Sequence, residues 1–426
     1  MRDGTAPGNG AAVWRGAGAR VEVAPRDGVA PRDRVAVIGA GPAGCAAAFR
    51  LQANGVRVVL LGEGRRKRLR MSESLPAAAR PLLRRLGAWE EFERDRHPAS
   101  PGIASAWAAA DLAGEDPFTA PLGRGWLVDR DRLDASLAAA ARSAGVPVLQ
   151  GVRVTETRRD GDGWRLSVLH TGITDDSDSR PGTRIESRGG RGEVRARFVV
   201  DASGRAGVLA RRLGEPVQAD RLMCAYAHLD RPPEAARRTL LESAEDGWWY
   251  AAAISAGPDA TPPGRLQTAV GFFSDPDVIR RASAATPGGW HALLRRTRHV
   301  YGLLGAPGPP SAVRSVLAAS HCLTRLYGEG WAAAGDAGSA LDPLSSAGVV
   351  TALRSGFEVA DGVQAALGGD YGALAALQRR TRSRYTSYLL DRNGYYGIET
   401  RWPDAPFWLR RANSRFQPGI LASPYA

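Results

Sequence analysis

A glycine-rich turn between a short apolar strand and an alanine-rich helix constrains this chain more than any other feature. Residues 34–38 are mostly apolar and β-branched, which predicts a buried parallel strand, and Gly39-x-Gly41-x-x-Gly44 follows directly. Gly39 permits the tight turn, Gly41 lets the backbone approach a pyrophosphate, and Gly44 lets helix and strand pack closely. Because a second apolar strand follows at 56–61, the context predicts a dinucleotide site at the positive end of the helix. The remaining residues of the predicted turn are Ala40, Pro42 and Ala43.

The residue that would bind the ribose is less regular. An acidic side chain is expected at the end of the second strand, about 20 residues after the glycines. Gly62 occupies that position, and Glu63 comes one residue later. Glu63 reaches the ribose hydroxyls if the strand ends one residue late; otherwise it is a solvated loop carboxylate.

Length, composition and charge exclude several classes of protein. The 426 residues, 44% of them hydrophobic, can bury one large core or two linked ones. No apolar run of about 18 residues and no secretory leader is seen, so we expect a cytoplasmic protein without a membrane span. Three scattered cysteines fit that compartment and predict no cysteine-based metal site. The net charge of +13 comes from arginine without interleaved aromatics, which predicts no nucleic-acid partner.

Changes in composition divide the chain. Residues 1–33 are rich in Gly, Ala, Pro and Arg, which predicts a disordered tail, and residues 171–192 are polar, which predicts an exposed loop. Short alternating stretches over 217–320 predict an antiparallel sheet that binds substrate. The nucleotide-binding domain is therefore predicted to be discontinuous, over 34–216 and 321–369, followed by a helical and aromatic C-terminal segment, 370–426. A basic run at 65–70 either meets phosphates or is a solvated loop.

Further acidic residues occur where strands are predicted to end. Asp201 follows the apolar residues Phe198, Val199 and Val200, and Gly335-Asp336 ends another strand. A loop containing Pro343 then leads to a helix that we expect to begin near Ser346 and to point at the same crevice. Glu73 lies in a polar loop before a helix, so it either approaches a bound ring or caps that helix.

These segments resemble the FAD-dependent monooxygenase and halogenase superfamily across roughly residues 34–410. The resemblance implies an α/β fold: a Rossmann-type FAD-binding domain with an inserted antiparallel-sheet substrate domain and a helical C-terminal part. It implies that Gly39, Gly41 and Gly44 bind the FAD pyrophosphate and that Asp336 binds the ribityl chain. The other FAD-binding residues it implies are Arg130, Val154, Asp201, Gly335, Pro343, Ser346 and Gly348.

Within that superfamily the chain is most similar to the flavoproteins that mature tryptophylquinone amine oxidases. Residues 72–87, 125–130, 342–346 and 401–408 carry this similarity. It implies hydroxylation of an aromatic, indole-like substrate, such as a tryptophan in a precursor peptide, through a flavin C4a-hydroperoxide. We expect backbone N–H groups from Ser346 to Gly348 to stabilise the departing alkoxide.

The base that removes the ring proton is not identified by the sequence. Glu73, His228, His299 and His321 are candidates by residue type. A structural role is the better expectation for each of the three histidines.

Halogenation is a competing interpretation of the same motifs. A halogenase needs a lysine that captures hypohalous acid and a nearby glutamate. The only lysine is Lys67, on the nucleotide side, and Ser345 stands where the family has its glutamate. Trp248-Trp249-Tyr250 lies near the place of the halogenase tryptophan signature without matching it, and either lines an aromatic pocket or packs in the core.

Two more functions are compatible with these motifs. An FAD-dependent reductase of isoprenoid double bonds shares Asp-Ala-Ser-Gly and Gly-Asp-Ala with this chain, and a flavin-binding chaperone for a precursor peptide would bind FAD without catalysis. The chain has a single GxGxxG and so no separate nicotinamide domain. NAD(P)H therefore reduces FAD directly or through a partner flavin reductase.

Overall fold

The computed structural model describes residues 34–64, 71, 73–100, 102–114, 123–171, 190–232, 238–254 and 266–412. The predicted tail 1–33, the basic run 65–70 with Lys67, and most of the predicted loop 171–192 lie outside the described residues.

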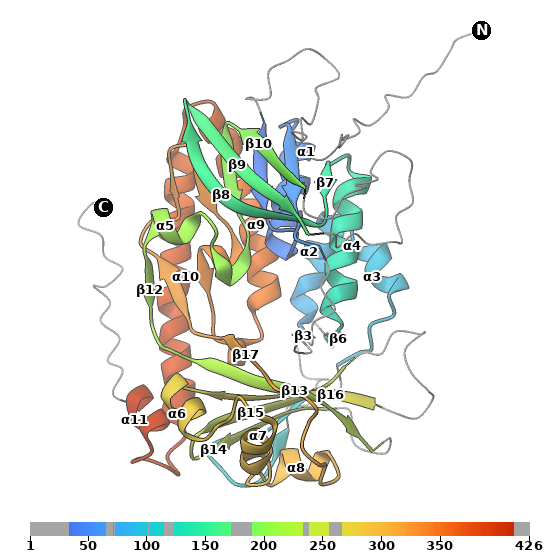
Figure 1. The fold of residues 1–426 in the computed structure, drawn as a ribbon, viewed down its shortest axis with the longest axis vertical. Helices are drawn as coiled ribbons and strands as arrows, with labels where there is room; N and C mark the ends of the chain where they lie inside the picture. The colour runs from blue at the N-terminus through green and yellow to red at the C-terminus, as the bar shows by residue number, and fades with distance from the viewer. Residues whose placement is uncertain are drawn as a thin grey trace.

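A six-stranded sheet in the order β19-β20-β11-β1-β2-β7 forms the first layer (Figure 1). β1 (Val35–Ile38) pairs in parallel with β2 (Val58–Leu61) and with β11 (Phe198–Asp201). All four residues of β1 are buried, because both faces of a parallel sheet are covered, and this explains its unbroken apolar run. The predicted α/β class is therefore confirmed.

The two faces of this sheet are covered differently. Val35 and Val37 of β1 pack against helices α1 (Pro42–Ala53), α4 (Arg130–Ser143) and α9 (Gly348–Leu367). Ala36 and Ile38 point the other way, because side chains alternate along a strand, and pack against the three-stranded sheet β10-β9-β8. The strands of that sheet are β8 (Val152–Asp160), β9 (Gly163–His170) and β10 (Arg191–Ala196).

The second layer is a seven-stranded sheet in the order β17-β13-β16-β15-β14-β4-β5. Its central strands β13, β16, β15 and β14 are antiparallel and lie within the predicted substrate region 217–320. However, β4 and β5 come from residues 103–114, which the predicted boundaries assign to the nucleotide-binding part, and β4 pairs with β14 in parallel. The strands are β4 (Ile103–Ala106), β5 (Ala113–Gly114), β13 (Met223–Arg231), β14 (Thr239–Ala244), β15 (Gly247–Ala253), β16 (Leu266–Ser274) and β17 (Arg314–Leu317).

One face of this second sheet carries helices α6 (Pro276–Arg281), α7 (Pro287–Leu294) and α8 (His299–Leu303). Figure 1 shows the long helix α10 (Gly372–Gly397) running along one side of the molecule from the first layer to the second. The chain then ends its described part with α11 (Pro406–Ala412), packed against the second sheet through Trp408. Among the described residues no helix combines the length and apolarity needed to cross a bilayer.

The remaining elements complete the first layer or lie outside the two large sheets. β7 (Val148–Leu149), β19 (Tyr327–Gly328) and β20 (Trp331–Ala333) complete the six-stranded sheet. Two smaller sheets lie outside the two layers, β3-β6 and β12-β18-β21. Their strands are β3 (Glu73–Leu75), β6 (Trp126–Val128), β12 (Pro216–Gln218), β18 (His321–Leu323) and β21 (Ser339–Ala340). The helices are α2 (Arg80–Arg85), α3 (Trp89–Arg94) and α5 (Ala210–Gly214), with short 3₁₀ turns at Ala77–Ala79, Gly204–Ala206, Gly335–Ala337 and Pro343–Ser345.

Candidate cofactor and substrate site

A single cavity of about 800 Å³ extends from the carboxyl ends of the central parallel strands to the second sheet. This is the edge at which open α/β sheets bind their ligands. The cavity brings together most of the residues predicted from the sequence. Its lining includes Gly39, Ala40, Gly41, Pro42, Ala43, Glu63, Glu73, Arg130, Val154, Asp336, Pro343, Ser346 and Gly348.

The three glycines of the turn have distinct local roles. Gly39 has φ +105°, and a Cβ there would lie 2.3 Å from the carbonyl oxygen of Ala202. A Cβ on Gly44 would lie 1.8 Å from the carbonyl oxygen of Gly39, so Gly44 serves helix packing and does not line the cavity. A Cβ on Gly41 would meet nothing within 4 Å. Gly41 thus leaves open space at the N-terminus of α1, where no side chain caps the helix.

Asp201, which was predicted to bind FAD, uses its carboxylate for hydrogen bonds within its own loop. Its Oδ1 accepts hydrogen bonds from the N–H and hydroxyl of Ser203, and its Oδ2 accepts from the N–H groups of Leu209 and Ala210. The side chain is fully buried and is not part of the cavity lining. Through these hydrogen bonds, Asp201 holds in place the turn whose residues 202–206 line the cavity. The strand ending was visible in the sequence, but the direction of the carboxylate was not.

Asp336 lies in the 3₁₀ turn after β20 and faces the cavity. Its Oδ2 is 3.4 Å from Nε of Arg205, and Arg205 also donates to the carbonyl oxygens of Ala319 and Leu341. Burial raises the pKa of Asp336, and the charge of Arg205 opposes that shift. A carboxylate here can accept hydrogen bonds from hydroxyl groups. Sequence reasoning missed Arg205 as a site residue; its one signal was its place directly after Asp-Ala-Ser-Gly.

Gly335 does not line the cavity, although it was predicted to bind the cofactor. It has φ +59°, and a Cβ there would lie 2.8 Å from Cβ of Ala43 on α1. Its N–H donates to Oγ of Ser355, at 2.8 Å. Gly335 is therefore needed for the close approach of the turn to α1 and α9, and it supports Asp336 rather than contacting a ligand.

Glu73 and Arg130 form an ion pair inside the cavity. β3 pairs with β6, and this brings Glu73 next to the start of α4, where its Oε1 lies 2.7 Å from Nη1 of Arg130. Arg130 also contacts Asp134, at 3.1 Å, and Asp129 caps α4 by accepting hydrogen bonds from the N–H groups of Asp131 and Arg132. Glu73 does not cap the following helix, whose N-cap is Pro76, so the expectation of a cap is wrong.

Glu63 and Val154, which were also predicted to bind the cofactor, line the same cavity. Glu63 is about half exposed, and its Oε1 lies 2.7 Å from Nη2 of Arg153. Val154 is two residues after Val152 in β8, so their side chains lie on the same face of the strand. Val154 is buried and lines the cavity. Arg153, which also lines the cavity, was not predicted.

The second sheet turns an aromatic face to the cavity. Two cross-strand rows point inward, Cys224–Phe273–Trp248 and Tyr226–Gly271–Tyr250, in the register of β13, β16 and β15. Tyr226, Tyr250 and Phe273 line the cavity, whereas Trp248 lies behind Phe273 and Trp249 packs into the core on the far face. The Trp-Trp-Tyr stretch thus contributes to both the pocket and the core, through different residues. Burial raises the pKa of Tyr250, and the Glu73 carboxylate adds to the shift, so its phenol stays protonated.

The loop before α9 differs in detail from the prediction. The helix begins at Gly348, after a 3₁₀ turn capped by Asp342, and Ser346 has φ +48°. The N–H of Ser346 donates to the carbonyl oxygen of Pro343, at 3.0 Å, so it is not available to a developing alkoxide. Of the backbone N–H groups from Ser346 to Gly348 that were predicted to stabilise the departing alkoxide, the candidates are therefore those at the start of α9, at Gly348. None of His228, His299 and His321 is among the residues that line the cavity.

The profile of a family described as FAD binding domain matches residues 32–384. The chain belongs to the FAD binding domain family. It is therefore a flavin-dependent enzyme of the predicted superfamily of FAD-dependent monooxygenases and halogenases, and the prediction of an FAD-dependent oxidoreductase is confirmed. The residues are compatible with this cofactor: there is open space at Gly41 that a pyrophosphate would need, and Asp336 presents a carboxylate to the cavity, where it would accept hydrogen bonds from ribityl hydroxyls.

Relatives of this FAD binding domain protein include oxidoreductases and halogenases. It is 26% identical over 380 residues to the FAD-dependent oxidoreductase LodB of Marinomonas mediterranea, covering 88% of this chain and 95% of LodB. It is 24% identical over 412 residues to a tryptophan 2-halogenase of Chondromyces crocatus, covering 91% of this chain and 72% of that protein. Among solved structures, the flavin-dependent halogenase CmlS superposes with a TM-score of 0.72 at 25% identity, covering 89% of this chain and 67% of CmlS. The peptidyl tryptophan dihydroxylase QhpG shares the fold, with a TM-score of 0.71 at 24% identity and coverage of 89% and 78%.

Proposed function

We propose that this protein is an FAD-dependent monooxygenase that hydroxylates an electron-rich aromatic ring of the indole type, and that the ring belongs to a tryptophan in a precursor peptide or protein. One atom of O₂ enters the ring, and the other leaves as water. The two electrons come from NAD(P)H, either directly or through a partner flavin reductase. FAD supplies the activation of O₂, and the protein supplies binding, orientation and exclusion of water.

The observation that carries this proposal is the continuity of one cavity from the glycine turn to an aromatic wall. Its lining includes Gly41 of the glycine turn as well as Tyr226, Tyr250 and Phe273 of the second sheet. Aromatic faces bind a flat ring by offset or edge-to-face stacking and add little polarity of their own. Met71 reaches between the two tyrosines over Gly271, where its unbranched side chain can adapt to a bound ring.

Each end of the cavity has a defined task in this proposal. The N-terminus of α1 at Gly41 binds the pyrophosphate, Glu63 and Val154 contact the adenosine end, and Asp336 binds the ribityl hydroxyls. The N–H at Gly348 faces the developing oxyanion. Glu73 takes the proton that leaves the ring carbon, because its carboxylate lines the cavity and its ion pair with Arg130, at 2.7 Å, fixes its position.

The names of two relatives support tryptophan as the substrate class. One is a tryptophan 2-halogenase, and the other is a peptidyl tryptophan dihydroxylase. LodB, which this chain covers almost from end to end, is named only as an FAD-dependent oxidoreductase.

Halogenation is the second candidate, because both the Chondromyces crocatus protein and CmlS are named as halogenases. The residues argue against it. The one lysine, Lys67, falls outside the described part of the chain, and no lysine lies in the cavity as far as the structure describes it. Ser345 donates its hydroxyl to the carbonyl oxygen of Asp342, at 2.8 Å, and offers no carboxylate.

The test is turnover with a tryptophan-containing peptide in air, with NADH, a flavin reductase, and chloride and bromide both present. We expect the peptide to gain about 16 Da, the mass of one oxygen atom, for each hydroxyl group introduced. A chlorinated or brominated peptide would instead establish halogenation. A peptide of unchanged mass would contradict both reactions and favour a reductase or a flavin-binding chaperone. Repeating the reaction without the flavin reductase identifies the route of the electrons.

A further inference from the structure

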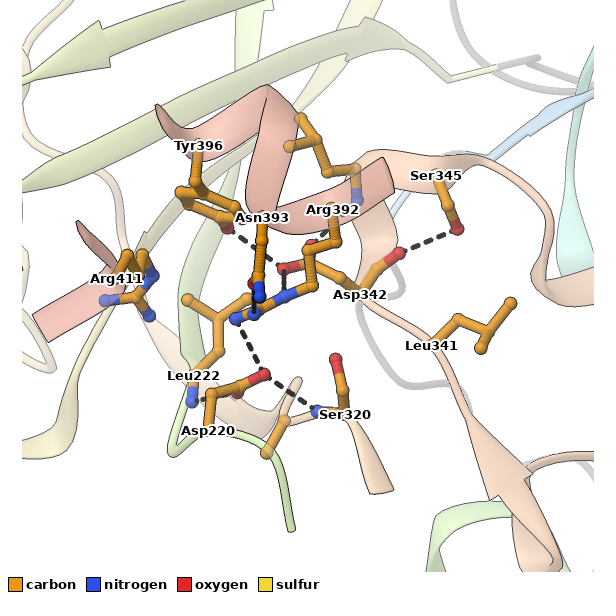
Figure 2. A network of polar contacts seen from close by, with 12 residues as sticks. Asp220, Leu222, Ser320, Leu341, Asp342, Ser345, Arg392, Asn393, Tyr396 and Arg411 are labelled. Atoms are coloured by element: carbon orange, nitrogen blue, oxygen red, sulfur yellow. Dashed lines mark hydrogen bonds and ion pairs between the residues drawn. The ribbon is translucent and has the colours of Figure 1, made fainter. Parts of the chain in front are cut away.

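A buried polar network joins the loop before α9 to helix α10 (Figure 2). Asp342, which is 1% exposed, accepts hydrogen bonds on Oδ2 from the hydroxyl of Tyr396, at 2.9 Å, and from Nε of Arg392, at 3.3 Å. Arg392 is paired in turn with Asp220, at 2.9 Å. The network therefore buries two carboxylates with one guanidinium, and each hydrogen bond to Asp342 offsets part of the cost of burying its charge.

The backbone of Asp342 is held by the same helix. Its N–H donates to the hydroxyl of Tyr388, at 2.7 Å, and Tyr388 is 2.7 Å from the hydroxyl of Ser320. Asp342 Oδ1 caps the following 3₁₀ turn through the N–H of Leu344, at 2.9 Å. Since Asp342 and Pro343 also line the cavity, α10 fixes the start of the loop that would face FAD.

Tyr396 also contacts the second sheet. Nε1 of Trp248 donates to the Tyr396 hydroxyl, at 2.9 Å, and that hydroxyl donates to Asp342. An indole N–H can only donate and an ionised carboxylate can only accept, so the group between them must do both. Burial raises the pKa of Tyr396, so its proton stays in place. Phenylalanine would fit the ring but break both hydrogen bonds.

Trp248 connects this chain of contacts to the wall of the cavity. Its ring stacks on Phe273, with centroids 3.9 Å apart and planes inclined by 4°. Phe273 lines the aromatic end of the cavity. An unbroken path of direct contacts therefore runs from the aromatic wall through Trp248 and Tyr396 to Asp342.

We propose that Tyr396 is a positioning residue that sets the loop from Asp342 to Gly348 against FAD and ties its position to the aromatic wall. The inference rests on FAD occupying the cavity and not on the reaction that follows. Loss of the hydroxyl releases the loop from the wall while Arg392 and Tyr388 still hold it to α10.

The test compares two tyrosine-to-phenylalanine substitutions on the same helix. Tyr385 is also buried, but its hydroxyl has no hydrogen-bond partner among the described residues. We expect Tyr396→Phe to weaken FAD binding about tenfold, the scale of a lost hydrogen bond to a charged group, and Tyr385→Phe to leave it within about twofold. At saturating FAD, the midpoint potential and visible spectrum of the bound flavin should change in Tyr396→Phe alone. FAD affinity and potential equal to those of the wild type in Tyr396→Phe would overturn the proposal.

A double-mutant cycle tests the path itself. Trp248→Phe should weaken FAD binding in the wild-type background and have no further effect in Tyr396→Phe, because the path is already broken there. In the Tyr385→Phe background its full effect should persist. Additive effects of Trp248→Phe and Tyr396→Phe would contradict transmission through the indole. These measurements need no substrate, so their outcome is independent of whether the peptide is hydroxylated.

Discussion

Gly41 and Gly44 are three residues apart and are under opposite constraints. Gly41 has φ −85°, a backbone conformation open to any residue, and space in front of it. Gly44 has no room at all, because a Cβ would overlap the carbonyl oxygen of Gly39. One glycine is therefore required by the ligand and the other by the fold.

This difference predicts different effects of the same substitution. Gly41→Val should weaken FAD binding by roughly 5- to 150-fold, the equivalent of about 1–3 kcal/mol of overpacking, and leave the thermal unfolding of the apoprotein unchanged. Gly44→Val should lower the unfolding temperature of the apoprotein itself. FAD titration by flavin fluorescence and thermal denaturation without FAD check the pair. Wild-type FAD affinity in Gly41→Val would refute the pyrophosphate assignment.

At the scale of elements, the segment between α10 and α11 is held to the second sheet by one carboxylate. Glu399 accepts hydrogen bonds from the N–H of Ala108, the hydroxyl of Ser243 and the guanidinium of Arg401. Burial alone would raise the pKa of Glu399, but the hydrogen bonds from Arg401, Ser243 and Ala108 outweigh it and lower the pKa to about 2. The charged carboxylate is therefore part of what docks this segment.

The lowered pKa of Glu399 predicts a stability that depends on pH. The stabilisation is fully present above the ordinary glutamate pKa of 4.5 and is lost as pH falls from there toward about 2. Between pH 6 and pH 3 the wild type should lose about 2 kcal/mol more of its unfolding free energy than Glu399→Gln, since one pKa unit corresponds to about 1.4 kcal/mol. Urea unfolding at both pH values measures this difference. Parallel losses in the two proteins would show that Glu399 is not the group that titrates.

At the scale of the whole molecule, the cavity lies between the edge of the parallel sheet and the aromatic face of the second sheet. A ligand there contacts both layers, so its binding energy stabilises them together. The two-layer arrangement also explains why β4 and β5 join the second sheet although they precede it by more than a hundred residues along the chain.

FAD should therefore stabilise the whole protein in one transition. At a free concentration of 100 times Kd, the gain is about 2.7 kcal/mol, visible as a higher unfolding temperature by calorimetry. Asp336→Ala should reduce the shift, because the ribityl hydroxyls lose their acceptor. A yellow Asp336→Ala protein with the wild-type shift would sink the assignment of Asp336. Asp277→Ala, which removes a surface carboxylate paired with Arg410 outside the cavity, is the matched control.

Local sequence determined the first strand and the glycine turn, because a buried strand and a positive φ each require particular residue types at fixed spacing. It also determined the cofactor class, FAD, since the glycine turn and the strand that ends at Asp336 follow one another along the chain in the order typical of that family. Only the tertiary structure decided which polar groups face the cavity. Asp201 turned out to bond to Ser203, Leu209 and Ala210 within its own loop, at separations of 2, 8 and 9 residues. Glu73 turned out to pair with Arg130, which is 57 residues away and which no local pattern encodes. Trp248 and Tyr396 are 148 residues apart, and Tyr396 and Asp342 are 54 residues apart. These three residues are joined only because helix α10, which carries Tyr396, runs along both layers.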